Sequence, residues 1–118
     1  MDKLDAMTAQ VRDFCDARDW RKYHTPKELA IGMATESSEL LQLFRFMSDE
    51  RIAEMFEDAG QRQAIEDEIA DTLLFLLRFA DLNRINLPAA LSSKLVRNGE
   101  RYPINASSVE YRKAGHRE

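Results

Sequence analysis

The chain has 118 residues, of which 44% are hydrophobic and 32% charged, with a formal net charge of −4 at pH 7. This length suits one domain with a real hydrophobic core, and the composition excludes both a disordered chain and a turn-rich all-β fold. The acidic balance argues against binding to a nucleic-acid polymer, and no stretch approaches the roughly 20 apolar residues of a membrane span.

Apolar residues at steps of three and four predict a first amphipathic helix over residues 3–18. The residues before it are polar and lack the apolar segment of a signal peptide, so we expect a cytoplasmic protein. Cys15 lies on the apolar side of this helix and is the single cysteine of the chain. It therefore excludes an internal disulfide and a thiolate zinc cluster, and we interpret it as a small core residue.

A second helix should begin after Thr25, which is suited to the N-cap, with Pro26 at the first helical position. The apolar positions that follow form one stripe along this helix. Glu36 falls on the stripe and Glu39 lies beside it, so two acids are expected next to the core.

A short acidic helix is expected over residues 48–60, with Gly60 as its C-terminal stop. A long helix should follow over residues 61–85. Its middle, residues 69–77, is apolar almost all round, which predicts burial on nearly every side and leaves Asp71 little access to water. A lone bundle of this size rarely covers such a segment, so we expect an obligate homo-oligomer, a homodimer or homotetramer.

The last helix is expected from Pro88 to Asn98, with Gly99 closing it. Residues 104–118 lack sustained periodicity and are predicted to form a loosely ordered tail. Residues 1–103 are thus predicted to be a single all-α domain, a bundle of four to five helices.

Two pairs of carboxylates, Glu36 with Glu39 and Glu68 with Asp71, each share one helical face at a spacing of three residues. Like charges so placed destabilise a helix by roughly 0.2–0.5 kcal/mol, and by more when they lose water. Oxygen ligands without histidine or cysteine select a hard cation, Mg²⁺ or alternatively Mn²⁺, over zinc or a di-iron centre. The alternative is a set of solvated surface charges, although two pairs beside apolar stripes are unusual for that.

A second polar group is expected at and just beyond the end of the last helix: Lys94, Asn98, Arg101 and Tyr102. Lysine, arginine and asparagine donors suit phosphate oxygens and the polar edge of a nucleoside. The alternative is a favourable placement of cations at a helix C-terminus.

Several aromatic side chains could stack on a base, namely Trp20, Tyr23, Phe46 and Phe75. The alternative is that each is an ordinary core or interface residue. His24 could hydrogen-bond to a substrate, or serve a structural role beside the helix cap.

Taken in order, these motifs resemble the MazG-like all-α nucleoside triphosphate pyrophosphatases, particularly the dCTP pyrophosphatase-like branch. The resemblance covers roughly residues 14–103 and is carried by residues 19–26, 36–40, 43–46, 68–71, 87–88 and 94–103. Any one of these motifs is weak alone, and their common order makes them specific.

The resemblance implies Mg²⁺-dependent hydrolysis of a nucleoside triphosphate, with dCTP or a modified dCTP foremost, to the monophosphate and pyrophosphate. It implies that Glu36, Glu39, Glu68 and Asp71 are metal ligands, and we expect Glu36 or Glu39 to act as the general base. It further implies that the substrate contacts Trp20, His24, Phe46, Phe75, Lys94, Asn98, Arg101 and Tyr102.

The chain departs from the family pattern at three positions. Phe46 and Phe75 stand where relatives typically have Trp and Tyr, which keeps stacking surface but removes polar groups. Thr35 stands where much of the family has a further glutamate. Two other functions therefore remain open: a housecleaning pyrophosphatase for other non-standard nucleotides, and a non-catalytic, nucleotide-sensing helical dimer.

Overall fold

The computed structural model describes residues 2–104, and within that range the chain is all-α, as predicted. Its helices are α1 (Lys3–Ala17), α2 (Pro26–Phe44), α3 (Asp49–Glu57), α4 (Ala59–Leu82) and α5 (Leu87–Arg101), with one 3₁₀ turn, η1 (Arg21–Tyr23), between α1 and α2. The chain divides into two compact units, residues 1–84 and 85–118, which we describe separately.

The start of every α-helix is fixed by a side chain that accepts a hydrogen bond from the backbone in the first turn. The caps are Asp2, Thr25, Ser48, Asp58 and Asn86. Each cap satisfies a backbone N–H that the helix leaves unpaired and contributes about 1 kcal/mol. The predicted cap at Thr25 is confirmed, since its Oγ1 lies 3.2 Å from the backbone nitrogen of Glu28.

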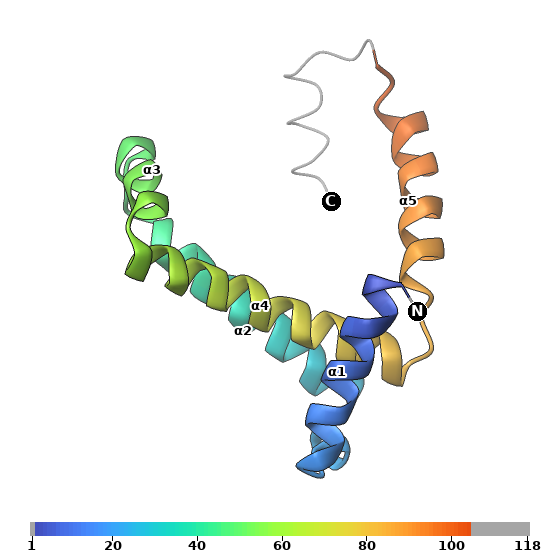
Figure 1. Ribbon diagram of the computed structural model, residues 1–118. Helices are drawn as coiled ribbons and strands as arrows, with labels where there is room; N and C mark the ends of the chain where they lie inside the picture. The colour runs from blue at the N-terminus through green and yellow to red at the C-terminus, as the bar shows by residue number, and fades with distance from the viewer. Residues whose placement is uncertain (1, 105–118) are drawn as a thin grey trace. The chain divides into compact units, whose positions relative to one another are not determined.

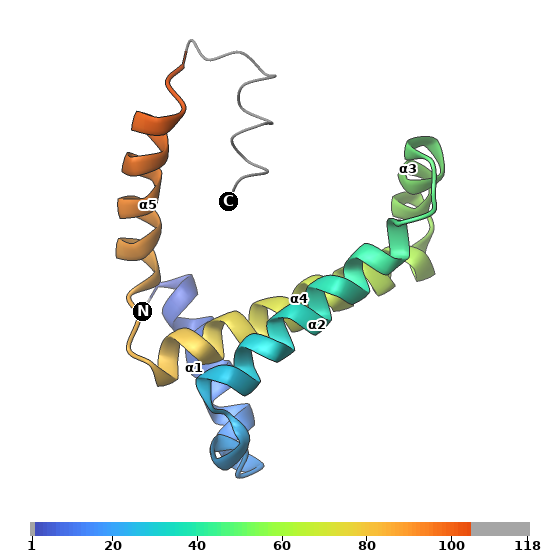
Figure 2. The same ribbon diagram turned by 180° about the vertical axis from the view of Figure 1, so that it is seen from behind.

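Helices α2 and α4 lie side by side as a long hairpin, which forms the body of the first unit (Figures 1 and 2). The short helix α3 lies at the end where α2 stops and α4 starts, and α1 packs on α4 at the opposite end. The buried apolar side chains are Cys15, Leu29, Met55, Ile65, Leu77 and Ala80. The prediction that Cys15 is a core residue is confirmed.

Helices α2 and α4 make a tight contact where Gly32 of α2 meets Phe75 of α4. A Cβ at position 32 would lie only 2.5 Å from Cε1 of Phe75, well inside van der Waals contact. The phenyl ring therefore rests against the backbone of α2, and only glycine leaves room for it there.

Two glycines predicted to stop helices do not do so. Gly60 lies in the first turn of α4, because Asp58 ends α3 and also caps α4 by accepting a hydrogen bond from the Gln61 backbone. Gly99 lies inside α5, where a side chain would meet no other part of the described chain within 4 Å, and the helix continues to Arg101. The predicted tail after position 104 lies outside the described residues.

The predicted all-round burial of residues 69–77 is wrong for the single chain. Ile69 and Leu76 are 51% and 41% exposed, and Asp71 is exposed as well. The reason is geometric: α2 covers one side of α4, while α1 and α3 pack against it at its two ends. None of the helices within residues 2–104 has the length and apolarity to cross a bilayer.

Candidate functional site

Three carboxylates meet in the middle of the hairpin. Glu36 and Glu39 come from α2 and Glu68 from α4, and one oxygen of each lies within 4.8 Å of the others. Glu36 and Glu39 lie about one turn apart on α2, and Glu68 comes from the neighbouring helix α4. The two helices therefore bring their acids to a common point. The prediction that these two sequence motifs converge is therefore confirmed for three of the four acids.

The cluster lacks the donors that normally accompany buried carboxylates. Oε2 of Glu36 and Oε2 of Glu68 are both shielded from solvent and have no hydrogen-bond partner. The neighbouring hydroxyls are used elsewhere: Ser37 donates to the carbonyl of Met33, and Thr72 donates to the carbonyl of Glu68. Across residues 2–104, no lysine or arginine forms an ion pair with any of the three acids.

This environment shifts the acids toward the protonated form. Burial raises the pKa of Glu36 to about 7, and contacts with Glu68 and Glu39 and the charge of Asp71 add to the effect. Burial also raises the pKa of Glu68, assisted by Glu39 and Asp71 and opposed by its contact with Glu36. Both shifts have the same sign, so the ionised forms of Glu36 and Glu68 are disfavoured in this cluster.

Asp71 is near this cluster but outside it. Its charge raises the pKa of both Glu36 and Glu68, whereas its own carboxylate is exposed and does not belong to the close group. Its predicted role as a metal ligand stays a prediction.

The donor set fits a hard divalent cation. Carboxylate oxygens alone are the ligands that Mg²⁺ and Mn²⁺ take, and a cation would supply the partner that the two buried oxygens lack. Beside the cluster is an open depression of about 390 Å³ along α2, lined by Ala34, Thr35, Ser38, Glu39 and Gln42. A ligand could therefore approach the acids from the Glu39 side.

An aromatic group lies toward the end of the hairpin where α2 begins. The Trp20 ring packs edge-on against Phe14 at 5.6 Å and against His24 at 6.1 Å between ring centroids. Trp20 keeps 37% of its surface exposed. Phe75 lies on α4 about 10 Å along the helix from Glu68, in the direction of this group. Trp20, His24 and Phe75 thus fall on one side of the acids.

Phe46 is not part of that group. It is 86% exposed, has the Arg45 guanidinium 4.6 Å from its ring centroid, and follows the other end of α2. It lies about 20 Å along the chain direction from Gly32, the residue that touches Phe75. The two phenylalanines therefore cannot hold the same base within one chain.

Three members of the polar set lie within the last helix, because α5 continues to Arg101, and Tyr102 follows its end as expected. Lys94, Asn98 and Arg101 recur at four and three residues and so share one face of α5, and Tyr102 is its C-cap. Because α5 belongs to the second unit, its contacts with the acids stay a prediction.

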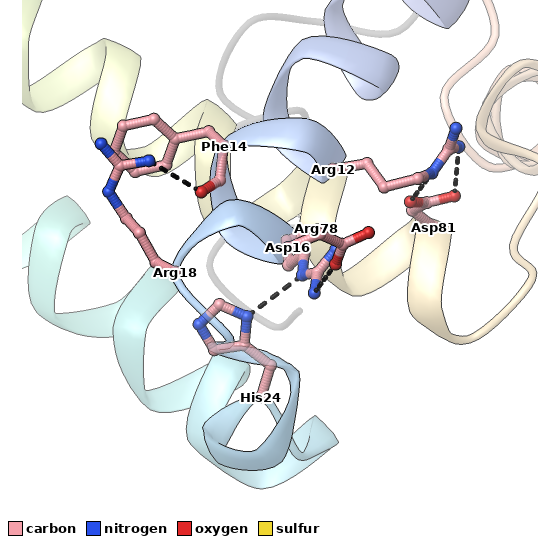
Figure 3. Close-up of polar contacts among 7 residues, drawn as sticks. All are labelled: Arg12, Phe14, Asp16, Arg18, His24, Arg78 and Asp81. Atoms are coloured by element: carbon pink, nitrogen blue, oxygen red, sulfur yellow. Dashed lines mark hydrogen bonds and ion pairs between the residues drawn. The ribbon is translucent and has the colours of Figure 1, made fainter.

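One buried charge was missed by sequence reasoning. Arg78 of α4 donates from Nε to Nδ1 of His24 at 3.1 Å and pairs with Asp16 at 3.4 Å (Figure 3). The available signal was a single cation inside the apolar run that precedes Leu82. Next to it, Arg12 of α1 and Asp81 of α4 form a two-bonded ion pair at 2.8 and 2.9 Å.

Comparisons with known proteins find relatives of the chain by sequence. No family model matches the chain. It is 33% identical over 95 residues to dCTP pyrophosphatase 1 of Rattus norvegicus, covering 80% of this chain and 56% of the relative. For dCTP pyrophosphatase 1 of Homo sapiens the identity is 32% over 101 residues, covering 86% and 59%. The chain thus spans little more than half the length of these curated relatives.

A solved structure extends the likeness to the whole fold. A pyrophosphatase from Archaeoglobus fulgidus superimposes with a TM-score of 0.80 at 36% identity, covering 87% of this chain and 94% of the archaeal one. A match of this extent in both sequence and fold is a family relationship, and the chain belongs to the MazG-like all-α nucleoside triphosphate pyrophosphatases.

Proposed function

We propose that the protein is a divalent-metal-dependent nucleoside triphosphate pyrophosphohydrolase, which cleaves its substrate to the monophosphate and pyrophosphate. The observation that carries the proposal is the trio Glu36, Glu39 and Glu68, two of whose buried oxygens lack a donor. Family membership supplies the reaction, and the names of the curated relatives favour dCTP or a modified dCTP as substrate.

The acids act first as a cation site. Glu36, Glu39 and Glu68 would hold Mg²⁺, with Asp71 as a further ligand and Mn²⁺ as the alternative ion. When bound, such an ion neutralises triphosphate charge and lowers the pKa of a bound water. Glu36 or Glu39 is the proposed general base, because both belong to the close group of acids, and Glu39 also lines the depression along α2.

The arrangement along the hairpin suits an elongated ligand. The acids would hold the triphosphate, while Trp20, His24 and Phe75, displaced along the hairpin in one direction, would hold the nucleobase. Aromatic faces stack on any base, so selectivity must come from polar groups such as His24. Lys94, Asn98, Arg101 and Tyr102 of α5 are proposed to contact the substrate as well.

Exposed apolar side chains support the proposal that the protein works as a homo-oligomer. Leu41 of α2 and Ile69 of α4 are 59% and 51% exposed on the first unit, and Leu91 and Leu95 of α5 are 60% and 58% exposed on the second. Covering them with a second copy would remove this apolar area from water. Phe46 is then proposed to contact a substrate held by the partner, since it cannot share a base with Phe75 in its own chain.

A substrate panel tests this function. Purified protein is incubated with each common ribo- and deoxynucleotide and with modified dCTPs, with Mg²⁺, with Mn²⁺ or with EDTA, and monophosphate is resolved from diphosphate. We expect monophosphate and pyrophosphate in equal amounts, fastest with dCTP or a modified dCTP, and none with EDTA. Faster turnover of other non-standard nucleotides would favour a housecleaning role, and binding without turnover would contradict an enzyme. The cytoplasmic location stays a prediction from the sequence.

A further inference from the structure

Arg78 is the most buried charged side chain among the described residues, with 1% of its surface exposed. Its guanidinium makes two polar contacts, Nε to His24 Nδ1 at 3.1 Å and Nη2 to Asp16 Oδ1 at 3.4 Å. The third nitrogen, Nη1, is buried and has no hydrogen-bond partner. One buried cation therefore links α1, η1 and α4, and it does so with incomplete pairing (Figure 3).

Stability alone does not explain this residue. A buried guanidinium with an unpaired N–H group is costly, and apolar side chains of similar volume usually replace buried ion pairs without loss. The Asp16 side chain that should compensate the charge is 53% exposed and makes only a long contact. The feature that an apolar residue could not supply is the directed N–H that Arg78 aims at His24.

That N–H determines where the histidine carries its proton. Arginine has donors only and stays charged, so the Nδ1 atom that accepts from it must present a lone pair. A neutral His24 then carries its proton on Nε2. Burial and the charge of Arg78 both lower the pKa of His24, which agrees with a neutral ring.

The free edge of the ring is directed away from this network. In Figure 3 the second ring nitrogen of His24 points to the side opposite Arg78. Among residues 2–104, the one side-chain hydrogen bond of His24 is made through Nδ1. The N–H on Nε2 is thus fixed in direction and has no partner in the described part of the chain.

We propose that Arg78 is a positioning residue that fixes His24 in the tautomer with its proton on Nε2, so that His24 presents one oriented donor to the substrate. This rests on the proposed function, in which His24 faces the nucleobase. The N–H on Nε2 of His24 would select a nucleobase that has a hydrogen-bond acceptor facing it, either a carbonyl oxygen or an unprotonated ring nitrogen.

The tautomer is measured directly by ¹⁵N NMR of the full chain labelled at histidine. The chain has two histidines, His24 and His116, and the spectrum of His24→Gln assigns them. We expect wild-type His24 with a protonated Nε2 and an unprotonated Nδ1, and a mixture of tautomers in Arg78→Met. A proton on Nδ1 in the wild type, or an unchanged ring in Arg78→Met, would overturn the proposal.

Kinetics distinguish positioning from simple packing. Arg78→Met should raise KM for the preferred nucleotide about tenfold, the usual effect of one lost hydrogen bond, with kcat changed less than about threefold. Arg12→Met is the matched control, because it breaks another arginine contact between α1 and α4 without touching His24. An equal rise in KM for Arg12→Met would mean that Arg78 acts only through stability.

Two substitutions of His24 test the donor independently, should Arg78→Met fold poorly. The amide of glutamine places an N–H near the position of Nε2, whereas that of asparagine lies near Nδ1. His24→Asn should therefore raise KM about tenfold, and His24→Gln should raise it less than His24→Asn does. Equal values for the two would overturn the proposal. The NMR result stands whether or not a nucleotide is cleaved, so failed hydrolysis overturns only the proposed function.

Discussion

Two places along the α2–α4 hairpin bury charge, one toward the end where α1 packs and one in the middle, but they treat it in opposite ways. Around Arg78, charges of opposite sign meet, and His24 and Asp16 take up two of the guanidinium nitrogens. Around Glu36 and Glu68, charges of like sign meet, and each acid keeps a buried oxygen without any donor. Two of the three Arg78 nitrogens are paired within the chain, whereas one buried oxygen each of Glu36 and Glu68 has no partner among the described residues.

This difference separates charges that are paired within the protein from charges that would be paired by a ligand. An ion pair formed within the protein needs no ligand to balance its charges. Carboxylates that repel one another, held together by two helices, lower the stability of the fold until a cation binds. Removing an acid of the trio should therefore reduce activity and stabilise the cation-free fold. Breaking the Arg12–Asp81 ion pair, which touches neither the acids nor His24, should reduce stability and spare activity.

The largest effect is expected from Glu68→Gln. Removing one ligand charge should reduce metal-dependent pyrophosphate release by at least about 100-fold, because a weakened cation no longer neutralises the triphosphate. The cation-free protein should unfold at higher urea than the wild type, since a raised pKa means that the ionised acid is unfavourable there. Glu66→Gln is the control: Glu66 is on the same helix and pairs at the surface with Arg62 at 3.7 Å. Activity lost equally in both variants would contradict the site.

The next effect is on the pH dependence of stability in EDTA. The folded protein holds the pKa of Glu36 near 7, above its ordinary value of 4.5, so folding favours the protonated acid. The contribution of Glu36 is therefore fully present below about pH 4.5 and is lost as the pH rises through 7. The free energy of unfolding in urea, measured from pH 5 to 8, should fall more steeply with rising pH for the wild type than for Glu36→Gln. Parallel curves would show that the acid is not strained.

A smaller effect is expected at the tight contact between the helices. Gly32→Ala places a methyl group 2.5 Å from the Phe75 ring, an overpacking cost of about 1–3 kcal/mol, offset by about 1 kcal/mol of helix propensity. We expect a net loss of about 1 kcal/mol in unfolding free energy and a higher KM. In the Phe75→Ala background the same change should be neutral or stabilising. A loss of equal size in both backgrounds would show that the ring is not the obstacle.

The smallest effect is expected from Asp81→Asn, which breaks the two-bonded pair with Arg12. The pair is partly exposed, so its loss should cost about 1 kcal/mol or less and leave activity intact. Hydrogen bonding to Arg12 lowers the pKa of Asp81, so its contribution is present above about pH 4 and disappears as the pH falls further. Chemical unfolding at pH 7 and pH 3 measures this. A stability difference between wild type and variant that persists at pH 3 would contradict it.

Much of the fold followed from local signals in the sequence. Periodicity gave the helices, and Thr25 with Pro26 gave the start of α2. The predicted helix ends at Gly60 and Gly99 were wrong, because both were inferred from the residue type alone. Helix α4 instead begins at the cap Asp58, and α5 ends at the cap Tyr102. Where a cap forms depends on the local geometry of the folded chain, which the spacing of residues in the sequence does not show.

The site was predictable where it depends on helical spacing. Glu36, Glu39 and Glu68 met as the pattern indicated, while the exposure of Asp71 depends on which flank of α4 is covered. Arg78 was not singled out, because its role depends on partners 54 and 62 residues away in the sequence. Contacts of that kind become visible only in the folded chain.

The central claim is that the acidic trio of the hairpin is a cation site. The most direct test is Mn²⁺ binding to the nucleotide-free protein, measured through the electron paramagnetic resonance signal of the Mn²⁺ that stays free. We predict saturable binding to the wild type, loss of binding in Glu36→Gln and Glu68→Gln, and unchanged binding in Glu66→Gln. Equal binding by all four proteins, or by none, would contradict the claim.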